Sequence, residues 1–157
     1  MTRAYGRAPT NERVYGAVPK NWGDNITLSA GLTHDGIIAP LRLTGAMNGE
    51  IFEAYIEQFV VPELRPGDVV VMDNLSAHKR ASIGQLIAGA QAQLVYLPPY
   101  SPDLNPIEMM GSKAKSVLRT IGARTLEDLE QAIVIALAAI TSTDAANYLR
   151  HAGYSLH

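Results

Sequence analysis

The stretch GDVVVMDN, Gly67 to Asn74, indicates which class of fold to expect. Its apolar run, Val69 to Met72, is typical of a parallel strand that is buried on both faces. Asp73 follows directly after this run. In open α/β sheets, ligands bind beyond the carboxyl ends of parallel strands, so Asp73 is a candidate functional residue. The alternative is that Asp73 belongs to an ordinary polar turn after a strand.

Patterns on both sides of this strand predict a single mixed α/β domain, with antiparallel strands first and parallel strands after them. In chain order we expect a short strand near Val14 to Val18, a hairpin of Ile26 to Leu32 and Ile37 to Leu43, a helix from Asn48 to Pro62, the strand Val69 to Met72, a helix capped by Ser76, a strand Gln93 to Leu97, and helices from Pro106 to Ile121 and from Thr125 to Ile140. Neither repeats nor a linker divide the chain.

Composition is that of a globular protein, with 47% hydrophobic and 18% charged residues in a chain of 157. The sequence has no apolar run long enough to span a bilayer, so we expect a soluble cytoplasmic protein without membrane contact. The absence of cysteine excludes disulfides and thiolate metal sites. A net charge of −2 gives no global attraction to nucleic acid, so any DNA contact has to be local.

A second candidate residue, Glu108, follows a loop that contains Pro98, Pro99, Pro102 and Pro106. Proline fixes φ and removes a backbone donor, so this loop has a rigid, nearly unique path. The alternative explanation for Glu108 is helix capping, with the preceding asparagine at the N-cap, proline at the first helical position and the glutamate closing the end.

Asp73 and Glu108 together suggest a metal site. If Gln93 to Leu97 pairs beside Val69 to Met72, the proline loop leaves the sheet at the end where Asp73 lies. Two carboxylates held together repel each other unless a cation lies between them, and hard oxygen ligands favour Mg²⁺ or Mn²⁺. Carboxylate-bound metal ions catalyse displacement at phosphorus.

Two motifs resemble the catalytic core of mariner-like DDE transposases in the bacterial insertion-sequence branch: VVVMDNLSAHK (Val69 to Lys79) and LPPYSPDLNPIE (Leu97 to Glu108). The 34 residues between Asp73 and Glu108 are typical of that branch. The resemblance extends to GRAP (Gly6 to Pro9), HDGIIAP (His34 to Pro40), MNGEIFEAYIEQ (Met47 to Gln58) and NYLRHAGY (Asn147 to Tyr154).

This resemblance implies a ribonuclease H-like fold, a mixed sheet flanked by helices, and Mg²⁺- or Mn²⁺-dependent DNA cleavage and strand transfer. It assigns Asp73 and Glu108 as the second and third metal-binding catalytic carboxylates. The implied partners are transposon ends and target DNA, and the complete protein is expected to be a homodimer. The implied location is the bacterial cytoplasm, in association with the nucleoid when the protein is active.

The chain departs from the family pattern in three ways. The family's first catalytic aspartate, on a central strand, and its helix-turn-helix region both lie upstream of the segment that matches Met1 to Pro9. Residues 1–157 are therefore expected to be a partial catalytic domain that lacks its first strand and is inactive alone, unless an upstream transposase half supplies that strand. Gly111 stands where relatives place a bulky aromatic residue, commonly tryptophan, and we expect a cavity or a collapsed neighbour beside it.

Two rival functions remain open. The first rival to a transposase domain is a non-catalytic remnant that serves as a DNA-binding or assembly module. The second is an unrelated α/β phosphoacceptor that is modified at Asp73. The second rival leaves the proline loop unexplained.

Asn74, Ser76 and His78 match the family's polar cluster after the second aspartate. They are candidates for orienting DNA or water near the metal ions. The alternative is that Ser76 caps a helix and His78 lies in its first turn.

Four basic residues are candidates for contact with DNA phosphates. On the helix that begins at Pro106, Lys115 and Arg119 fall within roughly 40° of Glu108. Lys79 and Arg80 follow the polar cluster. The alternative for all four is a solvated charged face.

Overall fold

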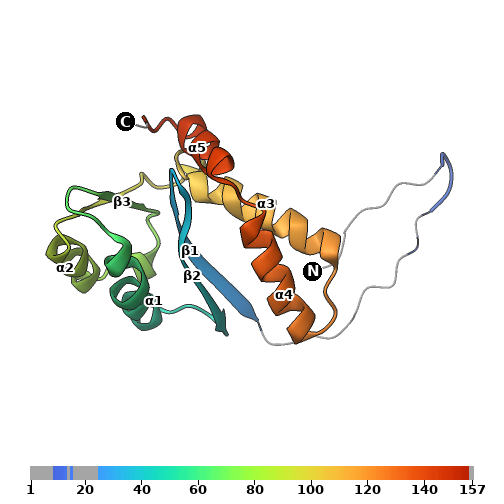
Figure 1. The fold of residues 1–157 in the computed structure, drawn as a ribbon, viewed down its shortest axis with the longest axis horizontal. Helices are drawn as coiled ribbons and strands as arrows, with labels where there is room; N and C mark the ends of the chain where they lie inside the picture. The colour runs from blue at the N-terminus through green and yellow to red at the C-terminus, as the bar shows by residue number, and fades with distance from the viewer. Residues whose placement is uncertain (1–8, 14, 16–24, 156–157) are drawn as a thin grey trace.

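A long antiparallel hairpin divides the molecule into two halves (Figure 1). The computed structural model describes residues 9–13, 15 and 25–155, so the strand predicted near Val14 to Val18 falls almost wholly outside the described residues. Strand β1 (Ile26–Thr33) pairs with β2 (Gly36–Thr44), as predicted. One half contains residues 49–96, and the other contains residues 106–151 (Figure 1).

A hydrogen bond at a bulge in the hairpin links the first half to the hairpin. The pairing register shifts between Ser29 and Gly31, and opposite this shift Ala39 adopts φ 48°. The carbonyl of Ala39 accepts a buried hydrogen bond of 2.9 Å from the Tyr55 hydroxyl. Burial raises the pKa of Tyr55 to about 12, so the phenol keeps its proton at any ordinary pH.

The first half contains two helices and a two-stranded parallel sheet. Helix α1 (Gly49–Tyr55) continues as a π-helical turn and a 3₁₀ turn that ends at Glu63. The Asn48 side chain caps it by accepting from the Ile51 N–H at 2.9 Å, as predicted. Strand β3 (Val69–Met72) pairs in parallel with β4 (Gln93–Tyr96), and α2 (Ala81–Gly89) connects them.

Two predictions for this half are wrong. Strand β3 is not buried on both faces, because the described part of the chain forms only two-stranded sheets, and Val69 is 55% exposed. Ser76 does not cap α2. The chain makes a 3₁₀ turn from Ser76 to His78 and then becomes extended at Arg80, so α2 begins at Ala81 without a side-chain cap.

The second half consists of three helices packed on the other face of the hairpin. Helix α3 (Pro106–Ile121) has the bounds that its sequence pattern predicts, and α4 (Leu126–Ala138) lies within the predicted range. Their buried contact residues are Met110, Ala114, Leu118, Ala132, Ile133 and Ala136, which pack with apolar residues of β1. This core is separate from the one around α1 and α2.

Helix α5 (Ser142–His151) was not predicted as a separate element. Its signal is present in the sequence, because Thr141 and Asp144 have capping-box spacing, and the structure contains both hydrogen bonds of that box. Asp144 also binds Lys113 of α3 at 2.7 Å. No single described helix is long and apolar enough to cross a membrane, although α4 and α5 meet that requirement together with a bend of 69° between them.

Asp144 makes the junction of α3 and α5 sensitive to acid. Hydrogen bonds from Lys113 and then Thr141 lower the pKa of Asp144 from 3.8 to about 2. A lowered folded-state pKa stabilises the fold fully above 3.8, and this contribution is lost as the pH falls toward 2. We therefore expect Asp144→Asn to melt below wild type at pH 6, with a gap that shrinks as the pH approaches 2. A gap that does not change with pH in thermal melts would contradict this.

Open space adjoins Gly111 in helix α3. Among the described residues, nothing lies within 4 Å of the position that a Cβ would occupy there, so no neighbour has collapsed against this glycine. A methyl group therefore fits without strain, and the helix gains backbone rigidity. We expect Gly111→Ala to raise the free energy of unfolding by about 1 kcal/mol, as measured by urea denaturation. A lower value for the variant would mean that α3 requires glycine at this turn.

Candidate active site

The parallel pairing of β3 with β4 brings the two candidate carboxylates to one edge of the sheet. The strands run in register from Val69 opposite Gln93 to Met72 opposite Tyr96. The Leu97 N–H then donates to the Met72 carbonyl at 2.8 Å, which extends the pairing by one residue. Asp73 and the proline loop consequently leave the sheet side by side, as predicted.

The loop from Leu97 to Pro106 is fixed by proline and by anchors along its length. Leu97 and Pro106 are buried at its two ends. Between them, Pro102 begins a short 3₁₀ turn, and the Leu104 carbonyl accepts a hydrogen bond of 2.8 Å from the Tyr154 hydroxyl. Four prolines and these contacts leave the loop little freedom, so it sets the point at which α3 begins.

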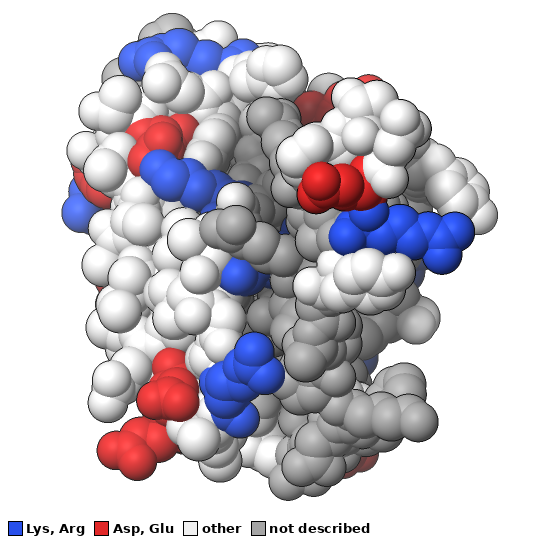
Figure 2. Space-filling model, turned by 90° about the vertical axis from the view of Figure 1, so that its right-hand side faces the viewer, with Lys and Arg blue, Asp and Glu red and all other residues white. Residues whose placement is uncertain are grey.

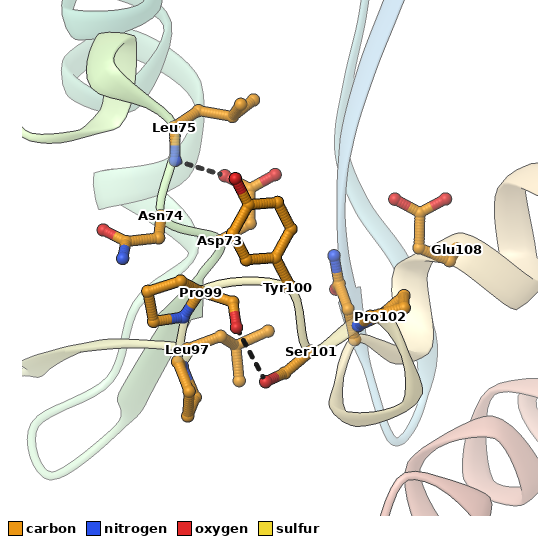
Figure 3. A pocket seen from close by; sticks show the side chains of 11 residues that line it. Asp73, Asn74, Leu75, Leu97, Pro99, Tyr100, Ser101, Pro102 and Glu108 are labelled. Atoms are coloured by element: carbon orange, nitrogen blue, oxygen red, sulfur yellow. Dashed lines mark hydrogen bonds between the residues drawn. The ribbon is translucent and has the colours of Figure 1, made fainter.

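An open groove of about 430 Å³ lies between the end of β3 and the start of α3 (Figure 3). Its lining comes from three segments: Asp73, Asn74 and Leu75 after β3, Leu97 to Pro102 of the proline loop, and Asn105 with Glu108 at the start of α3. In Figure 3 the carboxylates of Asp73 and Glu108 point toward the same side of the groove. The structure therefore brings the two predicted ligands to one site.

Glu108 does not cap its helix. Within the part of the chain that the structure describes, the Asn105 N–H donates to the Pro102 carbonyl at 2.9 Å instead of to the Glu108 side chain. The Asn105 side chain makes no capping hydrogen bond either. The capping explanation is thus wrong, and the exposed Glu108 carboxylate is available to a ligand.

Asp73 is oriented by its own turn and by His78. The Asp73 Oδ1 atom accepts from the Leu75 N–H at 3.2 Å and lies 2.6 Å from the Nδ1 atom of His78. Among the described residues, the His78 Nδ1 atom has no hydrogen-bond partner, so this short contact places the imidazole directly against the carboxylate without a hydrogen bond. The His78 ring is itself stacked on Phe52, with 4.0 Å between centroids.

The polar cluster predicted after Asp73 is only partly at the site. Asn74 lines the groove and His78 contacts Asp73, whereas Ser76 is exposed and does not line the groove. Tyr96 supports the same turn, because its hydroxyl donates to the His78 carbonyl at 2.6 Å.

The predicted basic residues differ in their surroundings. Arg80 binds Glu53 at 2.6 Å, which leaves its guanidinium less available to a phosphate. Lys79, Lys115 and Arg119 are exposed, and none of the ion pairs found among the described residues includes them. On the face drawn in Figure 2, Lys and Arg are interspersed with acidic and uncharged residues and form no continuous basic surface among the residues described there.

The donor set fits a hard divalent cation. Mg²⁺ is often held by one or two carboxylates, with water and substrate phosphates completing its shell. Asp73 and Glu108 supply two such carboxylates. Among the described residues, His, Asp and Glu side chains form no cluster of three that would hold a metal ion. Asp35 contacts His34, Asp68 accepts from the Arg65 N–H, and Asp24 lies outside the described residues.

Sequence reasoning missed the supports of the site. Phe52 holds His78 from α1, and no local pattern signals a contact across that distance in the chain. Tyr100 also lines the groove. Its signal was available, because an aromatic residue inside a run of prolines has no helix or strand face to occupy.

This geometry defines a general class of protein: a mixed α/β domain with a carboxylate-lined groove at the end of a parallel strand. The family model described as DDE superfamily endonuclease matches residues 1–132. The chain belongs to this family.

Solved structures of Mos1 transposase share the fold. The Mos1 Strand Transfer Complex is 17% identical with a TM-score of 0.70, over 97% of this chain and 46% of that one. The Mos1 mariner paired end complex with Mn is 16% identical with a TM-score of 0.67, over 97% and 47%. The Mos1 transposase catalytic domain with Raltegravir and Mn is 13% identical with a TM-score of 0.53, over 84% of each chain.

These matches confirm the predicted ribonuclease H-like mixed α/β fold. The chain spans about half the length of the first two Mos1 chains. No protein of curated function matches it in sequence.

Proposed function

We propose that this chain is the catalytic part of a DDE transposase, which cleaves DNA at transposon ends and joins them to target DNA with Mg²⁺ or Mn²⁺. Membership of the DDE superfamily endonuclease family supports the reaction class. The observation that carries the proposal is the groove that Asp73 and Glu108 both line, with a Glu108 carboxylate that is not used to cap its helix. The complete protein is proposed to act as a homodimer on DNA.

Each of these residues would have a distinct role in the proposed reaction. The Leu75 N–H and His78 hold the Asp73 carboxylate in one orientation, and the proline loop fixes where Glu108 begins its helix. When bound, Mg²⁺ or Mn²⁺ supplies charge neutralisation at a phosphate and lowers the pKa of a water nucleophile. Lys115 and Arg119 lie about 10 and 17 Å along α3 from Glu108, where they would contact phosphates farther along the same DNA strand.

One observation favours a second function. The described residues bring two carboxylates to the groove and no cluster of three ligands. A chain that keeps the fold and lacks a complete metal site would serve as a DNA-binding or assembly module. The two functions differ in whether the groove supports chemistry.

The test of the proposed site is a Mn²⁺ titration of the whole chain by calorimetry. With two carboxylates we expect weak binding, in the millimolar range or about 4 kcal/mol. Asp73→Ala and Glu108→Ala should each weaken it by at least about tenfold, because each removes one of two anionic ligands.

Glu127→Ala is the matched control, since Glu127 is an exposed glutamate at the start of α4 and does not line the groove. Unchanged Mn²⁺ binding in Asp73→Ala would contradict the shared site. Loss of binding in the Glu127→Ala control would show that the cation binds elsewhere.

A further inference from the structure

Tyr100 has an unusual position for an aromatic residue. Its relative exposure is 102%, so its ring contacts almost nothing in the described structure. Its φ is 58°, in the left-handed region that bulky side chains rarely adopt. Both features are unfavourable for an isolated domain, and together they point to a role outside the core.

The loop imposes this position on Tyr100. Pro98 and Pro99 precede it and Pro102 follows, so three nearby φ angles are fixed by proline rings. The loop is anchored on one side by the buried Leu97 and on the other by the hydrogen bond from Tyr154 to Leu104. The ring is therefore presented in a defined place, with little ordering left to occur on binding.

That place is the candidate active site. Tyr100 lines the same groove as Asp73 and Glu108. In Figure 3 its ring stands free of the loop and points toward the same side as the two carboxylates. A ligand whose phosphate approaches the carboxylates would bring its neighbouring atoms to the ring.

We propose that Tyr100 stacks on a nucleobase of the DNA strand that the groove receives. This inference rests on the proposed function, because it takes DNA as the occupant of the carboxylate groove. An exposed aromatic ring binds a base through its π-face, which requires no hydrogen bond and tolerates any sequence. A pre-positioned ring beside the reacting phosphate would fix the register of an unpaired base or a frayed end.

The experiment measures binding of a short single-stranded oligonucleotide that carries 2-aminopurine, whose fluorescence falls when it stacks on an aromatic ring. We expect the wild-type chain to quench the probe. Tyr100→Ala should abolish the quenching and weaken affinity by about tenfold, whereas Tyr100→Phe should keep both within about twofold. Tyr15→Ala is the matched control, because Tyr15 is also a highly exposed tyrosine, at 87%, and does not line the groove.

The same samples and Asp73→Ala are titrated with Mn²⁺, so that the stacking role and the proposed function are tested independently. Unchanged affinity and quenching in Tyr100→Ala, with Mn²⁺ binding intact, would overturn the stacking role and leave the proposed function in place. Failure of wild type to quench the probe would also overturn it. A change of oligomeric state in Tyr100→Ala without a change in DNA affinity would assign the ring to a protein contact instead. Mn²⁺ binding that does not depend on Asp73 would refute the proposed function itself.

Discussion

In the complete protein, with the upstream segment supplied, Asp73→Asn is expected to lower the rate of Mn²⁺-dependent DNA cleavage by a factor of about 10³ or more, which corresponds to about 4 kcal/mol of activation free energy. The substitution keeps the size of the side chain and an oxygen that can accept from the Leu75 N–H. It removes the negative charge that a cation in the groove requires. The loss would therefore reflect the metal site and not a misfolded turn. The measurement is nicking of supercoiled plasmid DNA in the presence of Mn²⁺.

Glu108→Gln should cause a loss of cleavage rate of similar size, because it also removes a negative charge from the groove. The loss would not reflect damage to α3, since Glu108 is not involved in helix capping. Glu127→Gln, on the exposed first turn of α4, should retain the wild-type rate. Equal nicking by wild type and Asp73→Asn would rule out the assignment of Asp73. A complete protein that binds Mn²⁺ at the groove without cleaving DNA would support the DNA-binding or assembly module.

Ile87→Ala should lower the free energy of unfolding by about 2–5 kcal/mol. Ile87 is 0% exposed and lies among Phe52, Tyr55 and Ile83 in the core of the first half. Truncation removes buried methyl groups and leaves a cavity that rigid neighbours cannot fill. Since a domain of this size has about 5–15 kcal/mol of stability, this one change would remove a large part of it.

Ile135→Ala provides the matched control, because Ile135 has the same chemistry on α4 but is 54% exposed. Its effect should stay within about 0.5 kcal/mol. Urea denaturation followed by circular dichroism gives both values. Similar losses in the two variants would mean that the apolar cluster of α1 and α2 is not the core of a cooperative unit.

The elements that sequence predicted well are those whose signals are local. Helix α3 has a proline at its first position, an apolar stripe and Gly122 in the left-handed conformation just beyond its end, so its bounds follow from neighbouring residues. The hairpin has alternation and a turn. The prediction that Ser76 caps α2 was wrong, because a good capping residue can also begin a short 3₁₀ turn. The extended backbone at Arg80 ends that turn before α2 begins.

The candidate site divides in the same way. The placement of Asp73 and Glu108 on one groove was predictable, because parallel strands and a stiff loop constrain where both residues leave the sheet. The exposure of Val69 was not, since an apolar run does not report how many strands flank it. The stack of His78 on Phe52 joins residues from different elements, and only the tertiary fold shows that they meet.

The hairpin gives the groove a mechanical property. Asp73 is attached to the half built on α1 and α2, whereas Glu108 is attached to the half built on α3 and α4, and each half has its own core. A ligand held by both carboxylates therefore couples two bodies. Its affinity includes the work of setting the spacing between them, and by reciprocity its presence resists their separation. Substitutions deep in either core, far from the groove, can thus alter cation affinity without touching a ligand.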